Sequence, residues 1–343
     1  MEKSYWQLKS LIFIIFQDKN KFLLISPEMS LLLELQPNQT RQYIDAETVF
    51  LELRRARTES AEVRGSMFWR TQGHSDYLIR ESAGGAQKSL GPRSPETQDI
   101  YDHFQHRKME TSKRLAALTT SAHNQQRLNK ALRVGRVPNI VVKTLNALEA
   151  ANLQDHFMVI GTHALYAFES ACGVRFIPDA LATQDLDLLF DTRKRMSFVS
   201  RMRRMDSSFI GALQKADSSF RVMPDQKQTA INDAGFEIDV IRRTAKDQDP
   251  HPFRMSADEN HLWAVQVDGA EKMLSAPRLS QVVVAETGHM AVMNTMNPVT
   301  FVAVKRMIAA AVSRDPKKRL KDVLQADLVE GLIQTHMPQF AAP

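Results

Sequence analysis

The sequence predicts an α/β (α+β) fold in which a central sheet is preceded and followed by helical regions. A short apolar run, Phe157–Ile160, stops at Gly161 and Thr162 and continues with a helical pattern, which is the order strand, tight turn, helix. Two further stretches, Thr183–Leu189 and Phe236–Ile241, alternate apolar with acidic residues, as half-buried strands do. Long segments on either side of these strands carry the period of amphipathic helices.

These patterns divide the 343 residues into three predicted regions. Residues 1–140 form an N-terminal, mostly helical region with a small hairpin module, and residues 141–255 form the core that holds the strands above. Residues 256–343 form a C-terminal hairpin and helical segment. A hydrophobic content of 43% is enough to build a substantial core.

The N-terminal region opens with an apolar run, Leu11–Phe16, that is far shorter than the roughly 20 residues needed to cross a bilayer. No small-residue cleavage pattern follows it, so we expect a buried strand or a misassigned start, and not a secretion signal. Residues 30–57 are helical in pattern, and we expect Pro37 to separate two helices. Residues 66–91 suggest short strands, and residues 99–133 a long helix rich in Arg and Lys. This basic helix is either a solvated face or a nucleic-acid-binding stripe.

Three carboxylates on the predicted strands point to a metal site. Asp185 and Asp187 are two residues apart, so on a strand they share one face, where they repel each other unless a cation lies between them. Oxygen ligands suit Mg²⁺. If the strand of Asp239 lies beside theirs, the three can hold two metal ions about 3.5–4 Å apart, an arrangement used for displacement at phosphorus.

The Gly-Thr turn supplies the phosphate-binding feature that such a site needs. Gly161 lets the backbone approach a phosphate closely, and the helix after Thr162 offers free N–H groups and a positive dipole end. The turn and the carboxylates together resemble the nucleotidyltransferase fold of the polymerase-β-like superfamily: Gly161-Thr162, then Asp185-x-Asp187, then Asp239 between apolar residues. Within that superfamily the chain resembles bacterial nucleotidyltransferase-like proteins related to abortive-infection toxins.

Two features depart from the superfamily pattern. Thr162 stands where Ser is commoner, and the spacer before the first Asp is longer than in minimal members. We interpret residues 171–182 as an inserted loop, because Gly173 ends the preceding helix and Pro178 prevents the helix from resuming.

The resemblance implies a mixed β-sheet nucleotidyltransferase core with helices packed on it. It implies that Asp185, Asp187 and Asp239 are catalytic and bind two Mg²⁺ ions, with Mn²⁺ as an alternative. Gly161 and Thr162 would hold the phosphates of a nucleoside triphosphate such as ATP.

The C-terminal helices add a third predicted phosphate ligand. Lys305 lies one position off the apolar stripe of its helix, where a lysine is disfavoured unless its ammonium reaches an anion or water. The resemblance implies that it contacts the triphosphate. Lys321 and Asp322 match the layout of the toxin-type relatives, although Asp322 also fits a helix cap.

Composition narrows the function classes. A net charge of +6 favours a polyanionic partner. The single cysteine, Cys172, excludes a disulfide framework and a Cys-rich zinc site, and it indicates a reducing, cytoplasmic location. We expect no membrane partner. We expect a metal-dependent nucleotidyltransferase that moves a nucleoside monophosphate from a triphosphate to a hydroxyl of an RNA 3′ end, a protein or a small molecule. Two alternatives remain open: a nucleotide-sensing protein without catalysis, and a nucleic-acid-binding module. The toxin resemblance also leaves open whether an antitoxin partner exists.

Overall fold

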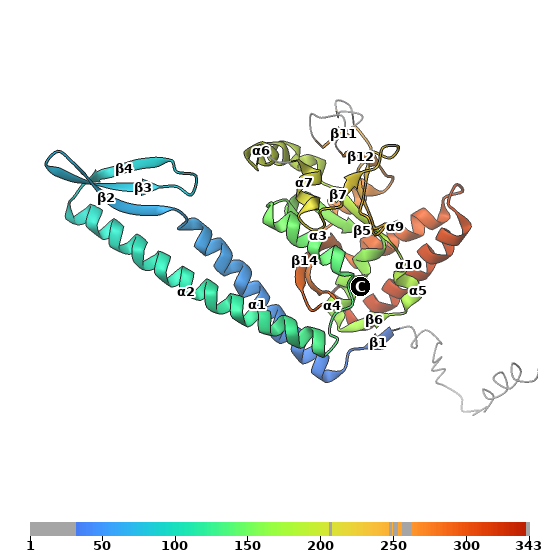
Figure 1. The fold of residues 1–343 in the computed structure, drawn as a ribbon. Coiled ribbons are helices and arrows are strands. Elements are labelled where there is room, and N and C mark those ends of the chain that lie inside the picture. The colour runs from blue at the N-terminus through green and yellow to red at the C-terminus, as the bar shows by residue number, and fades with distance from the viewer. Residues whose placement is uncertain (1–31, 206–207, 247–248, 250–252, 256–261, 341–343) are drawn as a thin grey trace, which may run out of the picture.

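The computed structural model divides into a helical arm with a small sheet at its tip and a core built on a large mixed sheet (Figure 1). The expected strand at Leu11–Phe16 lies outside the residues that the structure describes. Within those residues, no helix combines the length and the apolar character needed to span a membrane. The described ranges are 32–205, 208–246, 249, 253–255 and 262–340.

The arm consists of two long helices that lie side by side, α1 (Pro37–Glu62) and α2 (Pro95–Ala131). Each begins with proline at its first position, where the missing N–H costs nothing. The expectation that Pro37 separates two helices is therefore wrong. The residues before it form a short strand, β1 (Leu32–Glu34), since proline fits the start of a helix but not its interior.

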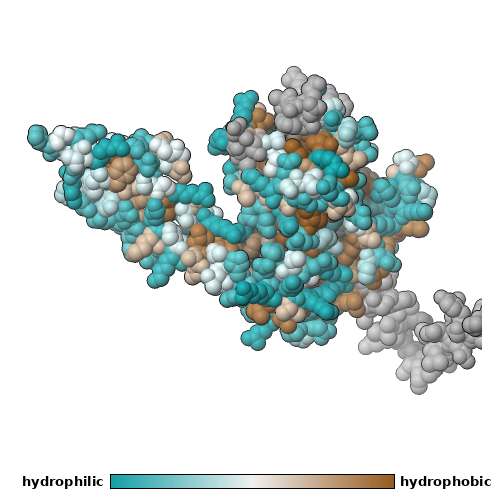
Figure 2. All heavy atoms as spheres, viewed as in Figure 1, coloured by the Kyte–Doolittle hydropathy of each residue, from teal (hydrophilic) through white to brown (hydrophobic). Residues whose placement is uncertain are grey.

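Between the arm helices the chain forms the predicted strands, now seen as a three-stranded antiparallel sheet. Its inner face packs on α2, where the Trp69 and Tyr101 rings lie 5.9 Å apart and the Arg80 guanidinium lies over the Phe104 ring at 4.5 Å. The arm surface is largely hydrophilic in the view of Figure 2. The three strands are β2 (Ser66–Gln72), β3 (Ser75–Glu81) and β4 (Gln87–Pro92).

The core sheet has nine strands in the described part of the chain, and its central order is β11-β12-β10-β7-β5-β14-β13. β7 runs antiparallel to β5 and parallel to β10, so the predicted mixed sheet and α/β class are confirmed. The predicted C-terminal hairpin, β13–β14, extends the same sheet beyond β5. The strands are β5 (Phe157–Ile160), β7 (Asp185–Phe190), β8 (Arg221–Val222), β9 (Thr229–Ile231), β10 (Glu237–Arg242), β11 (Phe253–Arg254), β12 (Trp263–Gln266), β13 (Arg278–Val284) and β14 (Met290–Met296).

Helices bury the apolar faces of this sheet. Leu186, Leu188 and Ile238, which alternate with the acidic residues, are fully buried, as the strand pattern predicts. Helix α3 packs against β14, helix α4 against β13, and α9 and α10 pack on each other. The core helices are α3 (Asn139–Ala150), α4 (Leu165–Cys172), α5 (Pro178–Leu181), α6 (Arg195–Met205), α7 (Phe209–Gln214), α8 (Ala270–Ser275), α9 (Pro298–Ala310) and α10 (Pro316–His336).

The segment that we interpreted as an inserted loop is structured. Gly173, with φ of 67°, ends α4 as predicted. The chain then forms β6 (Val174–Phe176), which pairs antiparallel with β1, and the single turn of α5. The loop interpretation is wrong because the pairing partner, β1, lies far away in sequence and has no local signal.

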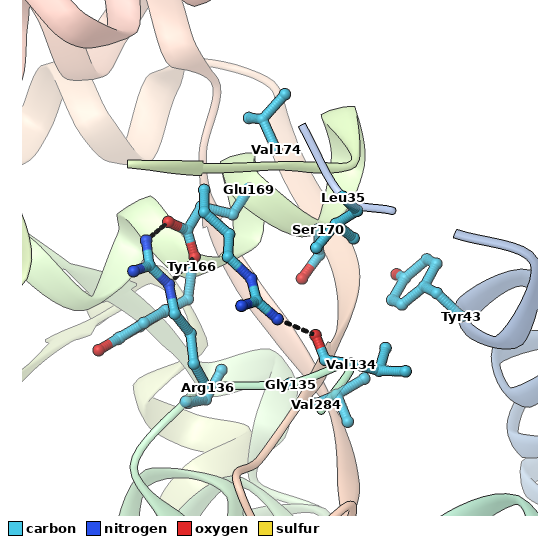
Figure 3. Close-up of a pocket in the computed structure, with 12 residues that line it drawn as sticks. Leu35, Tyr43, Val134, Gly135, Arg136, Tyr166, Glu169, Ser170, Val174 and Val284 are labelled. Carbon is cyan, nitrogen blue, oxygen red and sulfur yellow. Dashed lines mark hydrogen bonds and ion pairs between the residues drawn. The ribbon is translucent and has the colours of Figure 1, made fainter. Parts of the chain in front are cut away.

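The joint between arm and core is fixed by apolar and polar contacts. A small cluster of buried side chains joins the base of the arm to the β13–β14 hairpin, and the Tyr43 hydroxyl donates to the Val282 carbonyl at 2.7 Å. Figure 3 shows the linker beside it, where Arg136 Nε donates to Glu169 Oε2 at 3.0 Å. Glu169 in turn accepts from the Phe176 amide at 2.7 Å. The arm therefore leaves the core in a defined direction.

Candidate metal and nucleotide site

The sheet register brings the three predicted carboxylates together. β7 and β10 run parallel, and Asp187 lies directly opposite Asp239. On its other side β7 pairs with β5, so that Asp187 also faces Ile160, the last residue before the Gly-Thr turn. One carboxylate oxygen from each of Asp185, Asp187 and Asp239 lies within 4.8 Å of the others, and all three residues are half-buried.

Burial and mutual repulsion disfavour the negative charge of the central carboxylate. Burial raises the pKa of Asp187 to about 7, and repulsion from Asp185 and Asp239 adds to the rise, whereas Lys305 and Lys318 oppose it. Among the described residues, no Lys or Arg forms an ion pair with any of the three carboxylates. Convergent oxygen ligands with unbalanced charge are what a hard divalent cation requires, so the residues present fit Mg²⁺ or Mn²⁺.

Two threonine hydroxyls orient the outer carboxylates. Thr183 Oγ1 donates to Asp185 Oδ1, and Thr229 Oγ1, on the neighbouring strand β9, donates to Asp239 Oδ1. Burial raises the pKa of Asp239, although the Thr229 hydrogen bond lowers it. The sequence analysis identified neither threonine, because a hydroxyl that donates to a carboxylate can be recognised only once the strand pairing is known.

The glycine at the turn is required by its surroundings. Gly161 has φ of 67°, a left-handed conformation that residues with a Cβ rarely adopt. A Cβ at this position would lie 2.2 Å from Asp187 Oδ2. The turn therefore packs directly against the central carboxylate, which is where the backbone would meet a metal-bound phosphate.

The second turn residue is tied to the C-terminal helix. Gln325 on α10 is fully buried, and its Nε2 donates to Thr162 Oγ1 at 3.2 Å and to the Ala180 carbonyl at 2.6 Å. The hydrogen bonds connect the turn, α5 and α10. Sequence reasoning missed Gln325, because one polar residue on the apolar side of a helix gives no indication of its partner.

Burial raises the pKa of Asp187, and the nearby charge of Lys305 lowers it by a smaller amount. The direct partner of Lys305, however, is an acidic residue on α10. Its Nζ donates to Asp322 Oδ1 at 2.8 Å, while Arg314 Nε donates to Asp322 Oδ2 at 2.7 Å. Asp322 is buried within α10, and the cap of this helix is Asp315, which accepts from the Lys317 and Lys318 amides. The cap interpretation of Asp322 is therefore wrong.

Two lysines of α10, Lys318 and Lys321, also lie near the carboxylates. Lys318 opposes the raised pKa values of Asp187 and Asp239, in which burial is the largest cause. Lys321 Nζ donates to the Ala182 carbonyl at 2.6 Å, and burial lowers its pKa. The signal was present in the sequence as the basic run at residues 317–321, which the resemblance led us to interpret only through Lys321 and Asp322.

His163, just after the turn, packs in the core. Its ring is 1% exposed and lies 5.8 Å from the Tyr166 ring and 6.0 Å from the Phe236 ring. Burial lowers its pKa to about 4, so the ring is neutral at pH 7. A neutral, enclosed imidazole between two aromatic rings fits a packing role at this position.

Comparison with known proteins agrees with this geometry. A family model described as nucleotidyltransferase matches residues 139–342, well over half of the chain, and the match begins at the first residue of α3. No curated protein and no solved structure matches the chain. The narrower resemblance to abortive-infection toxins stays a prediction. With the matched region covering the carboxylates, the turn and the C-terminal helices, the chain belongs to the nucleotidyltransferase family.

Proposed function

We propose that this protein transfers a nucleoside monophosphate from a nucleoside triphosphate to an acceptor hydroxyl and releases pyrophosphate. The observation that carries the proposal is the convergence of Asp185, Asp187 and Asp239 within 4.8 Å, directly beside the Gly161 turn. Carboxylates serve to hold divalent cations, and a glycine turn admits phosphate. Family membership supports the reaction class.

Each residue of the site has a proposed role. Asp185, Asp187 and Asp239 would hold two Mg²⁺ ions, with Mn²⁺ as an alternative. When bound, these ions supply positive charge that stabilises the phosphate oxygens during displacement. The Gly161 backbone and Thr162 would hold the β- and γ-phosphates, and Lys305 would contribute a cation at the C-terminal side.

The proton balance of the reaction assigns a second role to one carboxylate. The acceptor oxygen forms a bond to the α-phosphorus, the bond from that phosphorus to pyrophosphate breaks, and the hydroxyl proton needs a base. Asp239 has a pKa raised by burial, which brings it nearer the working pH of a general base. Because Thr229 occupies Oδ1 of Asp239, the proton would go to Oδ2.

Incubation with each α-³²P-labelled nucleoside triphosphate, Mg²⁺ and total cell extract tests the proposal, and the gel mobility of the label identifies the acceptor as RNA, protein or small molecule. Asp187→Asn should abolish labelling, because it keeps the side-chain volume and removes the charge. Asp225→Asn, at an exposed position, is the matched control and should label like the wild type.

A thermal-shift measurement separates loss of metal binding from loss of folding. Mg²⁺ should raise the melting temperature of the wild type by mass action and leave that of Asp187→Asn unchanged. Labelling that persists in Asp187→Asn would count decisively against the proposal. Saturable nucleotide binding without transfer to any acceptor would favour the nucleotide-sensing alternative.

A further inference from the structure

A second functional surface lies between the arm and the core. A cleft of about 1060 Å³ opens where α1 and α2 diverge from the core, and its walls come from both arm helices, the C-terminal half of α3 and the start of β14. The hollow between the arm and the core is visible in the space-filling view of Figure 2. It is separate from the carboxylate cluster, none of whose members lines it.

The arm wall of this cleft is strongly basic. Arg54 and Arg57 lie one turn apart on α1, Arg64 lies two residues beyond the end of this helix, and all three line the cleft. The one lining carboxylate in the described part of the chain is Glu149, and it is already paired with Arg54 at 2.5 Å. Arg57 and Arg64 are exposed and form no ion pair within the described residues. Their charges therefore face the cleft uncompensated.

Imidazole and amide groups line other parts of the cleft. His289, which immediately precedes β14, contacts the Gln126 amide at 3.2 Å through Nδ1. Burial lowers the pKa of His289, and the charges of Lys143 and His123 lower it further. Asn146 lines the cleft from α3 and donates to the Met290 carbonyl at 3.0 Å.

One face of α3 connects the cleft with the end of the sheet that carries the carboxylates. Asn139, Lys143 and Asn146 recur at intervals of one turn, so they share this face. Asn146 lines the cleft, while Asn139 and Lys143 line a second pocket of about 370 Å³ together with Gln184 and Phe236. Gln184 immediately precedes Asp185. The polar face of α3 thus leads from the basic cleft to the beginning of β7.

We propose that the cleft and this face of α3 bind the sugar–phosphate backbone of a single-stranded nucleic acid and direct one of its ends towards the carboxylates. Two uncompensated guanidiniums, carried by residues about 10 Å apart along the arm, suit a repeating anion. Amides provide hydrogen bonds to sugar and base groups, and the half-buried Phe236 ring offers a stacking surface. The acceptor role in this inference rests on the proposed transferase function, whereas the binding itself does not.

Fluorescence anisotropy with a fluorescein-labelled, mixed-sequence RNA of about 20 nucleotides, and with DNA of the same sequence, tests the binding surface in EDTA without nucleotide. The double variant Arg57→Glu/Arg64→Glu should weaken binding about tenfold or more. It should also lower the slope of log Kd against log salt by about 1.4, because each lost phosphate contact contributes about 0.7. The better-bound strand identifies which nucleic acid is the natural ligand.

The matched control makes the same charge change on the arm outside the cleft. Arg41→Glu/Lys113→Glu alters exposed cations of α1 and α2 that do not line the cleft, and it should bind within about twofold of the wild type. Equal weakening by both double variants, or absence of binding by the wild type, would refute the proposal that the cleft binds nucleic acid. If poly-glutamate binds more tightly than either nucleic acid, and this binding depends on Arg57 and Arg64, the ligand of the cleft is an acidic protein and not a nucleic acid.

A third variant separates this inference from the catalytic one. Asp187→Asn should retain nucleic-acid binding, because the central carboxylate lies outside the cleft. If binding depends on Arg57 and Arg64 but the wild type transfers no nucleotide, nucleic-acid binding by the cleft is supported and the proposed transferase function is rejected. Transfer without such binding would reject the cleft alone.

Discussion

The core and the arm differ in how deeply they place charged residues. The core contains charges that are both buried and paired: Asp191 is 1% exposed and accepts from Arg193 at 2.8 Å and Arg278 at 3.0 Å. In the arm, charges lie at the surface: the Arg114 side chain is 44% exposed where it meets Glu52 and Glu59. A buried charge is fixed in place by its partners, whereas an exposed charge remains available to a ligand.

Packing explains the difference. The sheet of the core is backed by interlocking aromatic rings, among them Phe157 and Phe209, which stack 4.8 Å apart. Along the 37 residues of α2, all of them described, the buried positions are Thr97 and Asn129. A thin pair of helices cannot enclose charges, so the arm displays them. The proposed function therefore assigns precise positioning for chemistry to the core, and the proposed cleft assigns electrostatic attraction of a partner to the arm.

The largest expected effect concerns a buried ion pair of the core. Asp322→Asn should lower the free energy of unfolding by about 3 kcal/mol, because Lys305 and Arg314 would keep their charges in a buried setting without an anion. Urea unfolding measures the change. Asp327→Asn, on the same helix but in an exposed pair with Arg306, should cost less than about 1 kcal/mol. Similar losses in both variants would show that burial does not govern these pairs.

The buried His163 should make the free energy of unfolding sensitive to acid. Its pKa of about 4 lies below the unfolded value of 6.5, so the unfolded state binds more protons between these pH values, and the stabilising contribution is lost as pH falls from 6.5 towards 4. The loss should reach about 3 kcal/mol in the wild type. In His163→Gln the unfolding free energy, measured in EDTA at pH 7 and pH 5, should fall less between the two values. An unchanged slope in the variant would contradict this origin.

The glycine turn links packing to chemistry. In Gly161→Ala the new methyl group would displace Asp187, whose Oδ2 would be 2.2 Å away, and transfer should fall at least about a hundredfold. Gly173→Ala is the matched control, since Gly173 has the same φ of 67° and a methyl group there would meet no neighbouring atom within 4 Å. It should lose about 1 kcal/mol of stability and keep its activity. Equal losses of transfer would show that backbone strain, and not the contact with Asp187, is responsible.

Local patterns were sufficient to predict the acidic site. Alternation of apolar and acidic residues assigned Asp185, Asp187 and Asp239 to strand faces, and the proximity of the three followed once β7 and β10 paired in parallel. The Gly161 turn and the end of α4 at Gly173 were also predictable, because both depend on the conformational freedom of glycine.

Features that depend on distant partners were not predictable. The pairing of β1 with β6 joins residues about 140 positions apart, and neither strand has a pattern of its own. The Asp322 partner of Lys305 and the Gln325 contact with Thr162 arise only when α10 packs beside the turn. A sequence shows that a polar residue lies on an apolar face, but the packing of other elements decides which atom satisfies it.

The smallest expected effect tests the arm. Arg114→Ala removes two exposed ion pairs with α1 and should change the free energy of unfolding by less than about 1 kcal/mol, because solvent screens exposed charges. The same variant should leave nucleotide transfer to a small hydroxyl acceptor unchanged, since Arg114 lies outside both the cleft and the carboxylate cluster. Urea unfolding and the labelling assay measure the two quantities. A loss of several kcal/mol would mean that the arm, like the core, depends on its charges for folding. This result would contradict the proposed distinction between buried charges that stabilise the core and exposed charges of the arm that bind a partner.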